Sequence, residues 1–477
     1  MRPPRFLATR SAGAFGLTAL SALAMLTMSG CAVVGDNYKR PDSALPPAYR
    51  SADPAAVAAP SFAESDWRTV FTDAPLQALI DEALAAGPDA LLAAARVREA
   101  EALAGVARAG SLPTVGLALN TTPTARQGGA QFSSSFLGGV SASWEIDLWG
   151  RYARASEAAR ADLRAREASR DGIRTSLVAN TAGLYYQLAA LREIEAVTQR
   201  AIASQRDVLH LVNRLSAAGV SSAAEERQQE SALAATEARL PTLKRQVAEA
   251  ENALSILVGR VPGSLVFDVP ATLALPPALP SGLPSALLER RPDVLQAEAQ
   301  IRSANARVGE AKALFYPSIS LTALFGSVST KLSDVLRLQG ASVASLGPGV
   351  LQPLYAGGSL RFNEAANLAR LEIALLNYRK SVLGALAEVA NGLKAYEIGA
   401  EAMAIQARRV AASSESMRLA DKRFRAGTTS FLEVLNAQQQ LLAAETEQAQ
   451  SLLDRRLALI QVYLALGGGW QPTTAAD

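Results

Sequence analysis

The sequence has very few residues that support side-chain chemistry. Its 477 residues include one cysteine, Cys31, and one histidine, His210. The chain can therefore form no internal disulfide and cannot build a zinc site from cysteine and histidine ligands. His210 stands inside a long helical pattern and is interpreted as a helix-surface residue. Paired carboxylates occur on the predicted helices, but no Gly-rich phosphate loop accompanies them. We expect no catalytic residues, no metal site and no cofactor.

Aromatic and charged residues are also scarce, at 5% and 19% of the chain, whereas 49% of it is hydrophobic. The apolar surface is thus mostly Ala, Leu and Val, which is typical of long packed helices and excludes a disordered chain. No uninterrupted apolar run of about 20 residues follows residue 30, so no transmembrane helix is predicted. If this chain crosses a bilayer, it must do so with strands.

The N-terminus has the features of a lipoprotein signal. Three arginines precede a charge-free apolar stretch over residues 12–28, which predicts a signal peptide over residues 1–30. Small residues directly before Cys31 resemble a bacterial lipoprotein cleavage site, so we expect Cys31 to carry a covalent lipid. The alternative is a buried free cysteine. Ala32 follows where inner-membrane retention signals often have Asp, which favours the outer membrane.

The net charge of +3 comes from the signal segment alone. Without its three arginines, the 47 basic residues of the chain fall to 44 and match the 44 acidic residues. A nucleic-acid partner would require a basic surface. We therefore expect no nucleic-acid partner.

The rest of the chain is predicted to be a duplicated domain. Prolines mark an extended segment over residues 31–70 and a linker over residues 261–284. The first repeat covers residues 71–260, the second covers residues 285–467, and residues 468–477 form a tail. A repeat near 200 residues is too long for a solenoid. The matching residues are Arg98 and Arg302, Gly105 and Gly309, and Pro113 and Pro317 at an offset of 204, then Gly219 and Gly427, Glu225 and Glu433, Leu233 and Leu441, Glu237 and Glu445, and Gly259 and Gly467 at an offset of 208.

Each repeat is predicted to run helix, strand, strand, long helix, helix. The long helices cover about 151–215 and 359–424, and at 1.5 Å per residue each is roughly 95–100 Å long. Apolar residues recur every seven positions in the first long segment and in the helix that follows the second, which predicts coiled-coil packing. These residues are Leu177, Leu184 and Leu191, then Leu435, Leu442 and Ala449, and then Leu452, Leu459 and Leu466. Pro241 interrupts the helix that follows the first long helix, so we expect a kink or a joint there.

The strands are predicted from an alternation of apolar and polar residues. It is clearest over 140–147 and returns over 318–322, more weakly over 115–119, and in a fourth strand that ends near 349–351. One face of such strands can meet lipid while the other meets water. The alternative is a half-buried strand in a soluble sheet. Four strands are too few to span a membrane alone, so the chain must oligomerise if it spans one, as a dimer or a trimer.

Four strings resemble a known family. Residues 144–151 (WEIDLWGR), 288–294 (LERRPDV), 351–358 (LQPLYAGG) and 465–470 (ALGGGW) are similar to those of the outer membrane factors. These are TolC-like efflux lipoproteins of the NodT and OprM type. The resemblance covers the whole mature chain in order. The charged residues of the second string are interpreted as a helix cap and a salt bridge that fix the entry to the second repeat.

The resemblance implies a mainly α fold with a small β part. Three chains would form a homotrimer with a 12-stranded β-barrel in the outer membrane, continuous with a periplasmic α-barrel of long coiled-coil helices. Family members act as lipid-anchored exit ducts with a periplasmic adaptor protein and an inner-membrane pump, often of the RND type. The implied function is passive efflux of small molecules such as drugs across the outer membrane of a Gram-negative cell.

The resemblance also implies a periplasmic gate just after the turn over residues 425–430. Leu432 would form an apolar constriction, and Asn436 stands where efflux members commonly carry an Asp ring. Gln439 replaces an Arg often found one turn later. Alternatively, Asn436 faces a neighbouring helix and Glu433 supplies the charge of the aperture. Gly219 and Gly427 are expected to allow the tight helix-hairpin turns near which adaptors dock in the family.

Two other functions remain open at this stage. Within the family, the chain could be an exit duct for type I protein secretion, although its lipoprotein signal favours small-molecule efflux. Outside the family, it could be a periplasmic coiled-coil lipoprotein that only scaffolds, which would leave the alternating strands without a purpose.

Overall fold

The computed structural model describes residues 33–42, 66–125, 132–264 and 290–468. The predicted signal peptide, Cys31 and most of the predicted linker and tail lie outside these ranges. The elements in chain order are α3 (Trp67–Val70), α4 (Ala74–Ala86), α5 (Pro88–Ala109), β1 (Thr114–Ala125), β2 (Phe132–Ile146), α6 (Arg151–Ala217), α7 (Ala223–Glu237), α8 (Arg239–Leu257), α10 (Pro292–Ala313), β3 (Ser318–Ser329), α11 (Leu332–Leu336), β4 (Ala341–Leu351), α12 (Ser359–Arg425) and α13 (Phe431–Ala465).

The chain divides into two compact units, and each unit draws on both sequence repeats. Unit 1 contains the strands, residues 33–40 and the adjoining parts of α5, α6, α10 and α12. Unit 2 contains the remaining parts of these helices together with α3, α4, α7, α8 and α13. The predicted order of helix, strand, strand, long helix and helix is present in both repeats. The structure adds the short helix α11 between β3 and β4, and the last helix of the first repeat is divided into α7 and α8.

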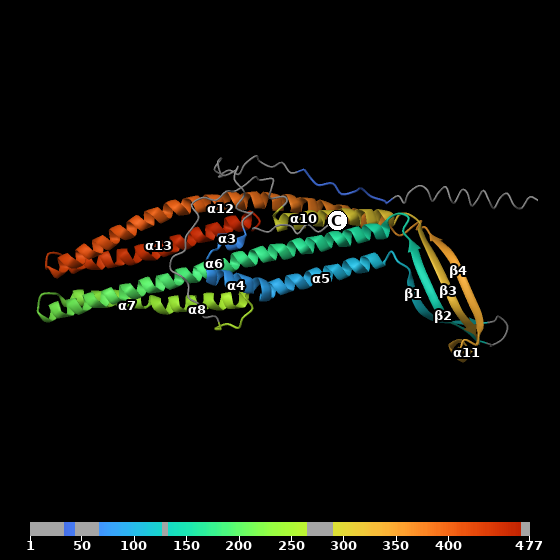
Figure 1. Ribbon diagram of the computed structural model, residues 1–477, viewed down its shortest axis with the longest axis horizontal. Helices are drawn as coiled ribbons and strands as arrows, with labels where there is room; N and C mark the ends of the chain where they lie inside the picture. The colour runs from blue at the N-terminus through green and yellow to red at the C-terminus, as the bar shows by residue number, and fades with distance from the viewer. Residues whose placement is uncertain (1–32, 43–65, 126–131, 265–289, 469–477) are drawn as a thin grey trace, which may run out of the picture. The chain divides into compact units, whose positions relative to one another are not determined.

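The sheet of unit 1 has four antiparallel strands in the order β1-β2-β3-β4, so each strand pairs with its neighbours in the sequence (Figure 1). In the register, Val140 of β2 lies opposite Leu117 of β1 and Phe325 of β3. All four strands lie where the alternation predicts them. Since paired residues point to the same side, this register gathers the alternating side chains of the four strands on two distinct faces.

The two long helices have equal lengths of 67 residues and begin at equivalent positions of the two repeats. Their ends, Arg151–Ala217 and Ser359–Arg425, agree with the predicted bounds to within two residues. At the α-helical rise each is about 100 Å long. The side chain of Asp147 accepts a hydrogen bond of 2.8 Å from the N–H of Ala153, which satisfies a free donor in the first turn of α6.

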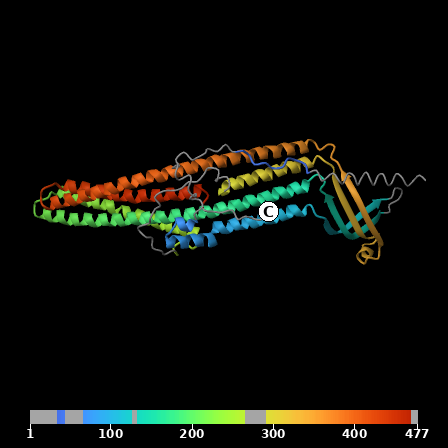
Figure 2. The same cartoon turned by 45° about the horizontal axis from the view of Figure 1, so that its top comes forward.

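The shorter helices of unit 2 run beside the long ones. In both views α7 and α8 lie alongside α6, and α13 lies alongside α12 (Figures 1 and 2). The break predicted from Pro241 is present, because α7 ends at Glu237 and α8 begins at Arg239. Pro241 falls in the first turn of α8. An N–H at this position would have no partner inside the helix, so proline loses no hydrogen bond there and its fixed φ is tolerated.

The core of unit 2 is closed by aromatic side chains from distant parts of the chain. The rings of Phe71 and Tyr463 meet edge to face with centroids 5.6 Å apart. Tyr185 donates a hydrogen bond to the buried carboxylate of Asp73. Burial raises the pKa of the Tyr186 hydroxyl to about 12. These contacts pack α6 and α13 against the segment that precedes α4.

No helix within the described ranges is both long and apolar enough to cross a membrane. In the same ranges no three His, Cys, Asp or Glu side chains lie close enough together to share a metal ion. His210 is exposed on α6, as interpreted from the sequence.

Candidate functional site

The two faces of the sheet differ sharply in chemistry. One face, here called the apolar face, is apolar across all four strands, although many of its side chains are exposed in the chain. Leu117 is 89% exposed and Phe325 is 70% exposed, for example. A continuous apolar surface of this size requires a cover. The apolar face carries Val115, Leu117, Leu119, Val140, Ala142, Trp144, Ile319, Leu321, Phe325, Leu346 and Val350.

The opposite face is mostly polar or small. It carries the hydroxyl and amide side chains of Thr114, Asn120, Thr122, Ser141, Ser143, Ser318, Ser320, Thr322 and Ser345. Leu137 and Leu324 are among the few apolar exceptions. Gly139 and Gly326 pair directly on this face, and a Cβ on Gly139 would lie 2.6 Å from the Cα of Gly326. The strands approach closely at this pair, because neither residue has a side chain there.

The two helix-hairpin turns of unit 2 are built alike. Gly219 and Gly427 have φ of +75° and +71°, the left-handed conformation that glycine adopts at low cost. The N–H of Val220 bonds to the carbonyl of Leu215 at 2.8 Å, and the N–H of Thr428 bonds to that of Arg423 at 3.0 Å. Each turn is therefore a Schellman motif that ends a long helix. The predicted structural role of both glycines is confirmed.

The helices that follow these turns begin differently. The Ser222 hydroxyl and the Glu225 carboxylate form a reciprocal capping box at the start of α7. Hydrogen bonds from Ser221 and Ser222 lower the pKa of Glu225. At the equivalent position of α13, Ser430 makes no side-chain cap, and Glu433 instead forms an ion pair of 3.0 Å with Arg423. The charge of Glu433 is thus directed back toward α12.

The three predicted gate residues share one face of α13. Leu432, Asn436 and Gln439 follow one another at spacings of four and three residues, which places them above each other on a helix. All three are exposed, and Leu432 is 51% exposed. Within the described part of the chain, neither the Asn436 nor the Gln439 side chain makes a hydrogen bond. This chain alone therefore leaves the face without a partner.

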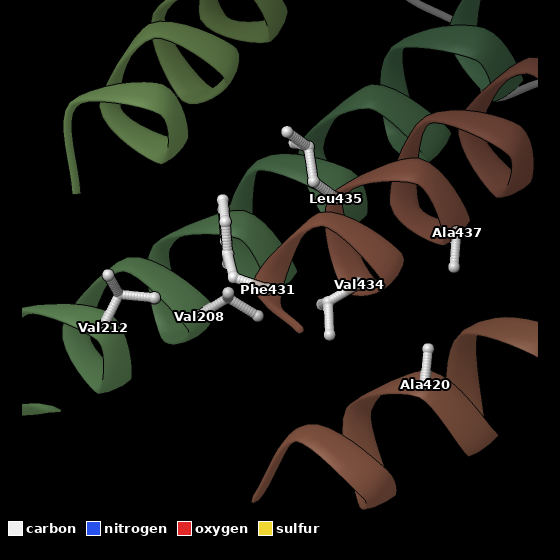
Figure 3. Packing of buried hydrophobic residues seen from close by; sticks show 7 residues of the cluster. All are labelled: Val208, Val212, Ala420, Phe431, Val434, Leu435 and Ala437. Atoms are coloured by element: carbon white, nitrogen blue, oxygen red, sulfur yellow. The ribbon is translucent and has the colours of Figure 1, made fainter. Parts of the chain in front are cut away.

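The opposite face of α13 is buried in a small apolar cluster. Figure 3 shows Phe431 and Leu435 beside Val208 and Val212 of α6, with Ala420 of α12 close to α13. Phe431 is 1% exposed and Val212 is fully buried. Burial of apolar area is favourable by about 25 cal/mol per Å². The favourable burial of these side chains therefore fixes the rotation of the first two turns of α13 about the helix axis. The exposed side of α13 is therefore set by the packing of its other side.

Next to this cluster lies a layer of buried amide side chains. The amide of Gln438 approaches the Ser204 hydroxyl at 3.4 Å, and the amide of Gln229 donates to the carbonyl of Gln205 at 2.8 Å. The side-chain oxygens of Gln205, Gln229 and Gln438 have no hydrogen-bond partner within the described residues. Such half-satisfied polar groups weaken a core compared with apolar packing.

An N-terminal strap, defined as residues 33–40, is bound to unit 1 close to the predicted lipid site. Arg154 of α6 is 3% exposed and donates hydrogen bonds to the carbonyls of Val34 and Gly35 at 3.2 and 2.8 Å. The N–H of Val34 bonds to the carbonyl of Trp149 at 3.0 Å. A Cβ on Gly309 would lie 2.9 Å from the Val34 carbonyl oxygen. Cys31 itself lies outside the described residues.

The charged string at the start of α10 forms a structural junction, as interpreted from the sequence. Arg291 is 7% exposed and forms a two-pronged ion pair with Asp293, at 2.8 and 2.9 Å. The same guanidinium pairs with Glu388 of α12 at 2.8 Å and donates to the carbonyl of Ala465 at the end of α13 at 2.9 Å. Burial disfavours the charge, but the hydrogen bonds to the two carboxylates outweigh it and raise the pKa of Arg291.

Sequence reasoning missed two of these features. The burial of Arg154 beneath the strap leaves no local signal, because its partners lie about 120 residues away. The second is the packing of α11 on the apolar face, where the side chain of Val335 lies against Gly138 of β2. By contrast, the capping box had a readable signal, since Ser222 and Glu225 stand three residues apart before a helical pattern.

Comparison with known proteins gives a family for this arrangement. The family model described as "Outer membrane efflux protein" matches residues 79–260 and 283–468, which are nearly the whole of both predicted repeats.

Individual relatives match over almost the full chain. The pyoverdine export outer membrane protein OpmQ of Pseudomonas aeruginosa is 34% identical over 85% of this chain and 87% of its own length. The toluene efflux pump outer membrane protein TtgC of Pseudomonas putida is 31% identical over 95% of this chain and 96% of its own length. The solved structure of the outer-membrane channel OprN superposes with a TM-score of 0.83 at 30% identity, covering 92% of this chain and all of that chain.

Proposed function

The chain belongs to the outer membrane efflux protein family, and we propose that it is the exit duct through which a tripartite efflux system releases small molecules across the outer membrane. The sheet supports this assignment most directly. An apolar face that spans four strands opposes a face rich in hydroxyl groups, which is the division that a wall between lipid and water requires. A scaffold lipoprotein would have no use for such a sheet.

The working unit in this proposal is a homotrimer. Four strands cannot enclose a passage, and an eight-stranded wall leaves an interior only wide enough for side chains. Twelve strands from three chains leave room for a solute. The exposed apolar face of the sheet is then covered by lipid, and its polar face borders the passage.

The gate of the duct is assigned to the exposed face of α13. Leu432 forms its apolar constriction, and the amides of Asn436 and Gln439 follow along the same face. Three chains place three copies of each residue around one axis. A ring of amides carries no charge, so it selects weakly between cations and anions. Glu433 is the nearby carboxylate, and its negative charge is offset by the ion pair with Arg423.

The duct is held in the outer membrane by its strands and by a lipid on Cys31. The strap that follows Cys31 is bound by Arg154 at the point where β2 leads into α6, within unit 1. Only one residue separates Cys31 from the described strap. The lipid is thus tethered beside the strands rather than at the end of a long free segment.

An adaptor protein and an inner-membrane pump, of the RND type, complete the system. The adaptor docks near the two exposed helix-hairpin turns at Gly219 and Gly427. The pump supplies the energy, so the duct itself catalyses no reaction. We expect the pump to set the substrate. The relatives named for pyoverdine export and for toluene efflux differ widely in what they carry, which supports a duct with little selectivity of its own.

The decisive experiment is native mass spectrometry of the protein extracted from outer membranes in mild detergent. The expected species is a trimer of chains that begin at an acylated Cys31. A parallel sample of Cys31→Ser, produced with an ordinary secretory signal, should form the same trimer without the lipid mass. The trimer should also conduct ions across a planar bilayer.

Either a monomer or a dimer without conductance would contradict the exit-duct proposal and favour the scaffold. A trimer that begins at a residue other than Cys31 would preserve the duct and remove the lipid assignment. Export of a protein rather than of small molecules from cells that carry the native operon would support the type I secretion alternative.

A further inference from the structure

A short helix and the sheet form an apolar groove in unit 1. The helix α11 joins β3 to β4 at the end of the sheet away from α10 and α12, and Figure 2 shows it beside the strands. The groove has a volume of about 670 Å³. Its apolar walls are Leu117, Leu119, Val140 and Phe325 from the strands and Leu336 and Leu338 from α11 and the residues after it.

The position of α11 is fixed by one buried side chain. Val335 is 4% exposed, and its Cγ1 lies 2.5 Å from the place where a Cβ on Gly138 would stand. Gly138 belongs to the apolar face, because it pairs with Leu119. The absence of a side chain at Gly138 therefore lets α11 sit directly on the sheet. The neighbouring leucines of α11 are left outside this contact.

Those leucines remain exposed in the chain. Leu336 is 70% exposed, and Leu338 is 77% exposed. Leu338 also has a φ of +56°, a left-handed conformation that is unfavourable for a leucine. Glycine or asparagine is the usual residue in such a position. An apolar side chain is thus held at the groove at some cost to the backbone.

Basic residues stand at both ends of α11. Lys331 precedes the helix, Arg337 follows it, and both side chains are exposed. Within the described residues, neither forms an ion pair. The one acidic residue of the segment, Asp334, is occupied by hydrogen bonds from the hydroxyls of Ser329 and Ser333. The groove is thus lined mostly by apolar side chains, with Ser327 and Ser342 also in its lining. Two positively charged residues flank the helix that forms one of its walls.

From these features we propose that the groove binds a phosphorylated lipid of the outer leaflet, with an acyl chain against the leucines and a phosphate between Lys331 and Arg337. The inference rests on the proposed function, which puts the long helices in the periplasm. The α11 end of the sheet then lies on the outer side of the membrane. The apolar face continues into the groove, so one lipid can contact both.

The chemistry of the site selects an anionic lipid over a neutral one. Apolar burial alone would accept any acyl chain, since it is not directional. Each basic group near an anionic lipid surface adds about 1 kcal/mol, or about a fivefold gain in affinity. Two such groups give about a thirtyfold preference. A free phosphate would gain the charges but none of the apolar contact.

The test is native mass spectrometry of the trimer titrated with lipid A that carries two phosphates, and with phosphatidylethanolamine. We expect the native protein to bind lipid A more tightly, with one copy per chain. The double variant Lys331→Gln/Arg337→Gln should bind lipid A about thirtyfold more weakly. The matched control is Arg239→Gln/Lys244→Gln on α8, which removes the same charge elsewhere and should bind as the native protein does.

A third variant tests the apolar wall without risk to the fold. Leu338→Gly relieves the left-handed strain and removes the exposed leucine, so it should assemble normally and bind lipid A more weakly. Equal binding of lipid A by the native protein and by the Lys331→Gln/Arg337→Gln variant would overturn the proposed site, while trimer formation and conductance would still support the exit duct. A native protein that neither forms a trimer nor conducts would overturn both.

Discussion

Single residues make the two halves of this duplicated chain unequal. Ser222 and Glu225 close a capping box at the first hairpin turn, whereas Ser430 and Glu433 stand at the equivalent places without closing one. The reason is a competing partner, because Glu433 pairs with Arg423. The second turn thus lacks a cap worth about 1 kcal/mol. This turn leads directly into the residues assigned to the gate.

The first prediction concerns the amide at Asn436. Asn436→Asp should make conductance in planar bilayers more cation-selective by severalfold, because three carboxylates around a narrow axis attract cations and repel one another. The selectivity of the variant should also weaken at acid pH, where the carboxylates are protonated. The native protein should show neither behaviour.

A control with the same added charge separates the gate from the rest of α13. Gln448→Glu places a carboxylate on the same helix but on a different face, since 12 residues are not a whole number of helical turns. It should leave the selectivity unchanged. The assignment of Asn436 to the gate would be wrong if native protein and Asn436→Asp showed the same selectivity.

At the scale of helices, one buried arginine joins three elements. Arg291 stands before α10, pairs with Glu388 of α12 and bonds to the carbonyl of Ala465 at the end of α13. A helix end has free carbonyls that need donors, and a cation near them is favourable. Arginine suits this place because its planar group can serve several acceptors at once.

The second prediction is that Arg291→Ala lowers the stability of the helical part by about 2 kcal/mol, the usual cost of losing hydrogen bonds to charged groups. Asp293 and Glu388 are about half exposed and can regain water, which limits the loss. Arg291→Lys should recover only part of it. The measurement is the midpoint of urea unfolding followed by the helical circular dichroism signal.

The comparison for this prediction is an exposed ion pair of the same kind. Arg245→Ala breaks the pair with Glu249 on α8, where both side chains are about 60% exposed. Surface pairs contribute about 0.5 kcal/mol or less, so its midpoint should hardly move. If Arg291→Ala unfolded at the same urea concentration as Arg245→Ala, the junction would have no stabilising role.

At the scale of the whole molecule, the strap carries the link between the lipid and the fold. Its contacts come from distant parts of the chain, including the Asn305 side chain, which donates to the carbonyl of Asp36 at 2.8 Å. Gly309 has no side chain, which allows the strap to lie close to α10 at Val34. Its counterpart in the first repeat, Gly105, has no atom within 4 Å of the place where a Cβ would stand. The two glycines are equivalent in the repeats, but only Gly309 packs closely against another segment.

The third prediction uses this pair. Gly309→Ala should loosen the strap, because the new methyl group would lie within about 3 Å of Val34 and Arg154. Trypsin should then cut after Lys39 faster than in the native protein, since cleavage follows the population of the open form. Gly105→Ala should leave the rate of this cut unchanged. Equal rates in all three proteins would show that Gly309 does not hold the strap.

Much of this arrangement was predictable from local patterns. The alternation in β1 to β4 and the long helical segments are signals with periods of two to seven residues. The turn glycines are single-residue signals between two helical segments. The joint near Pro241 and the salt bridge between Arg291 and Asp293 could also be predicted, because proline and helix starts impose local rules. The contacts of Arg291 with Glu388 and Ala465 could not, because these residues are far away in sequence. The family followed from strings of six to eight residues, such as 144–151.

The order of elements and the membership in an efflux family could thus be inferred from the amino-acid sequence, because each depends on residues that are near one another in the chain. The duplication could be inferred because similar strings recur about 200 residues later. The folded chain was needed to learn which side of α13 is exposed, that Arg154 and Gly309 hold the strap, and that Val335 seats α11 on Gly138. These features arise from contacts between residues far apart in sequence. No periodicity encodes them, since they depend on how whole elements pack.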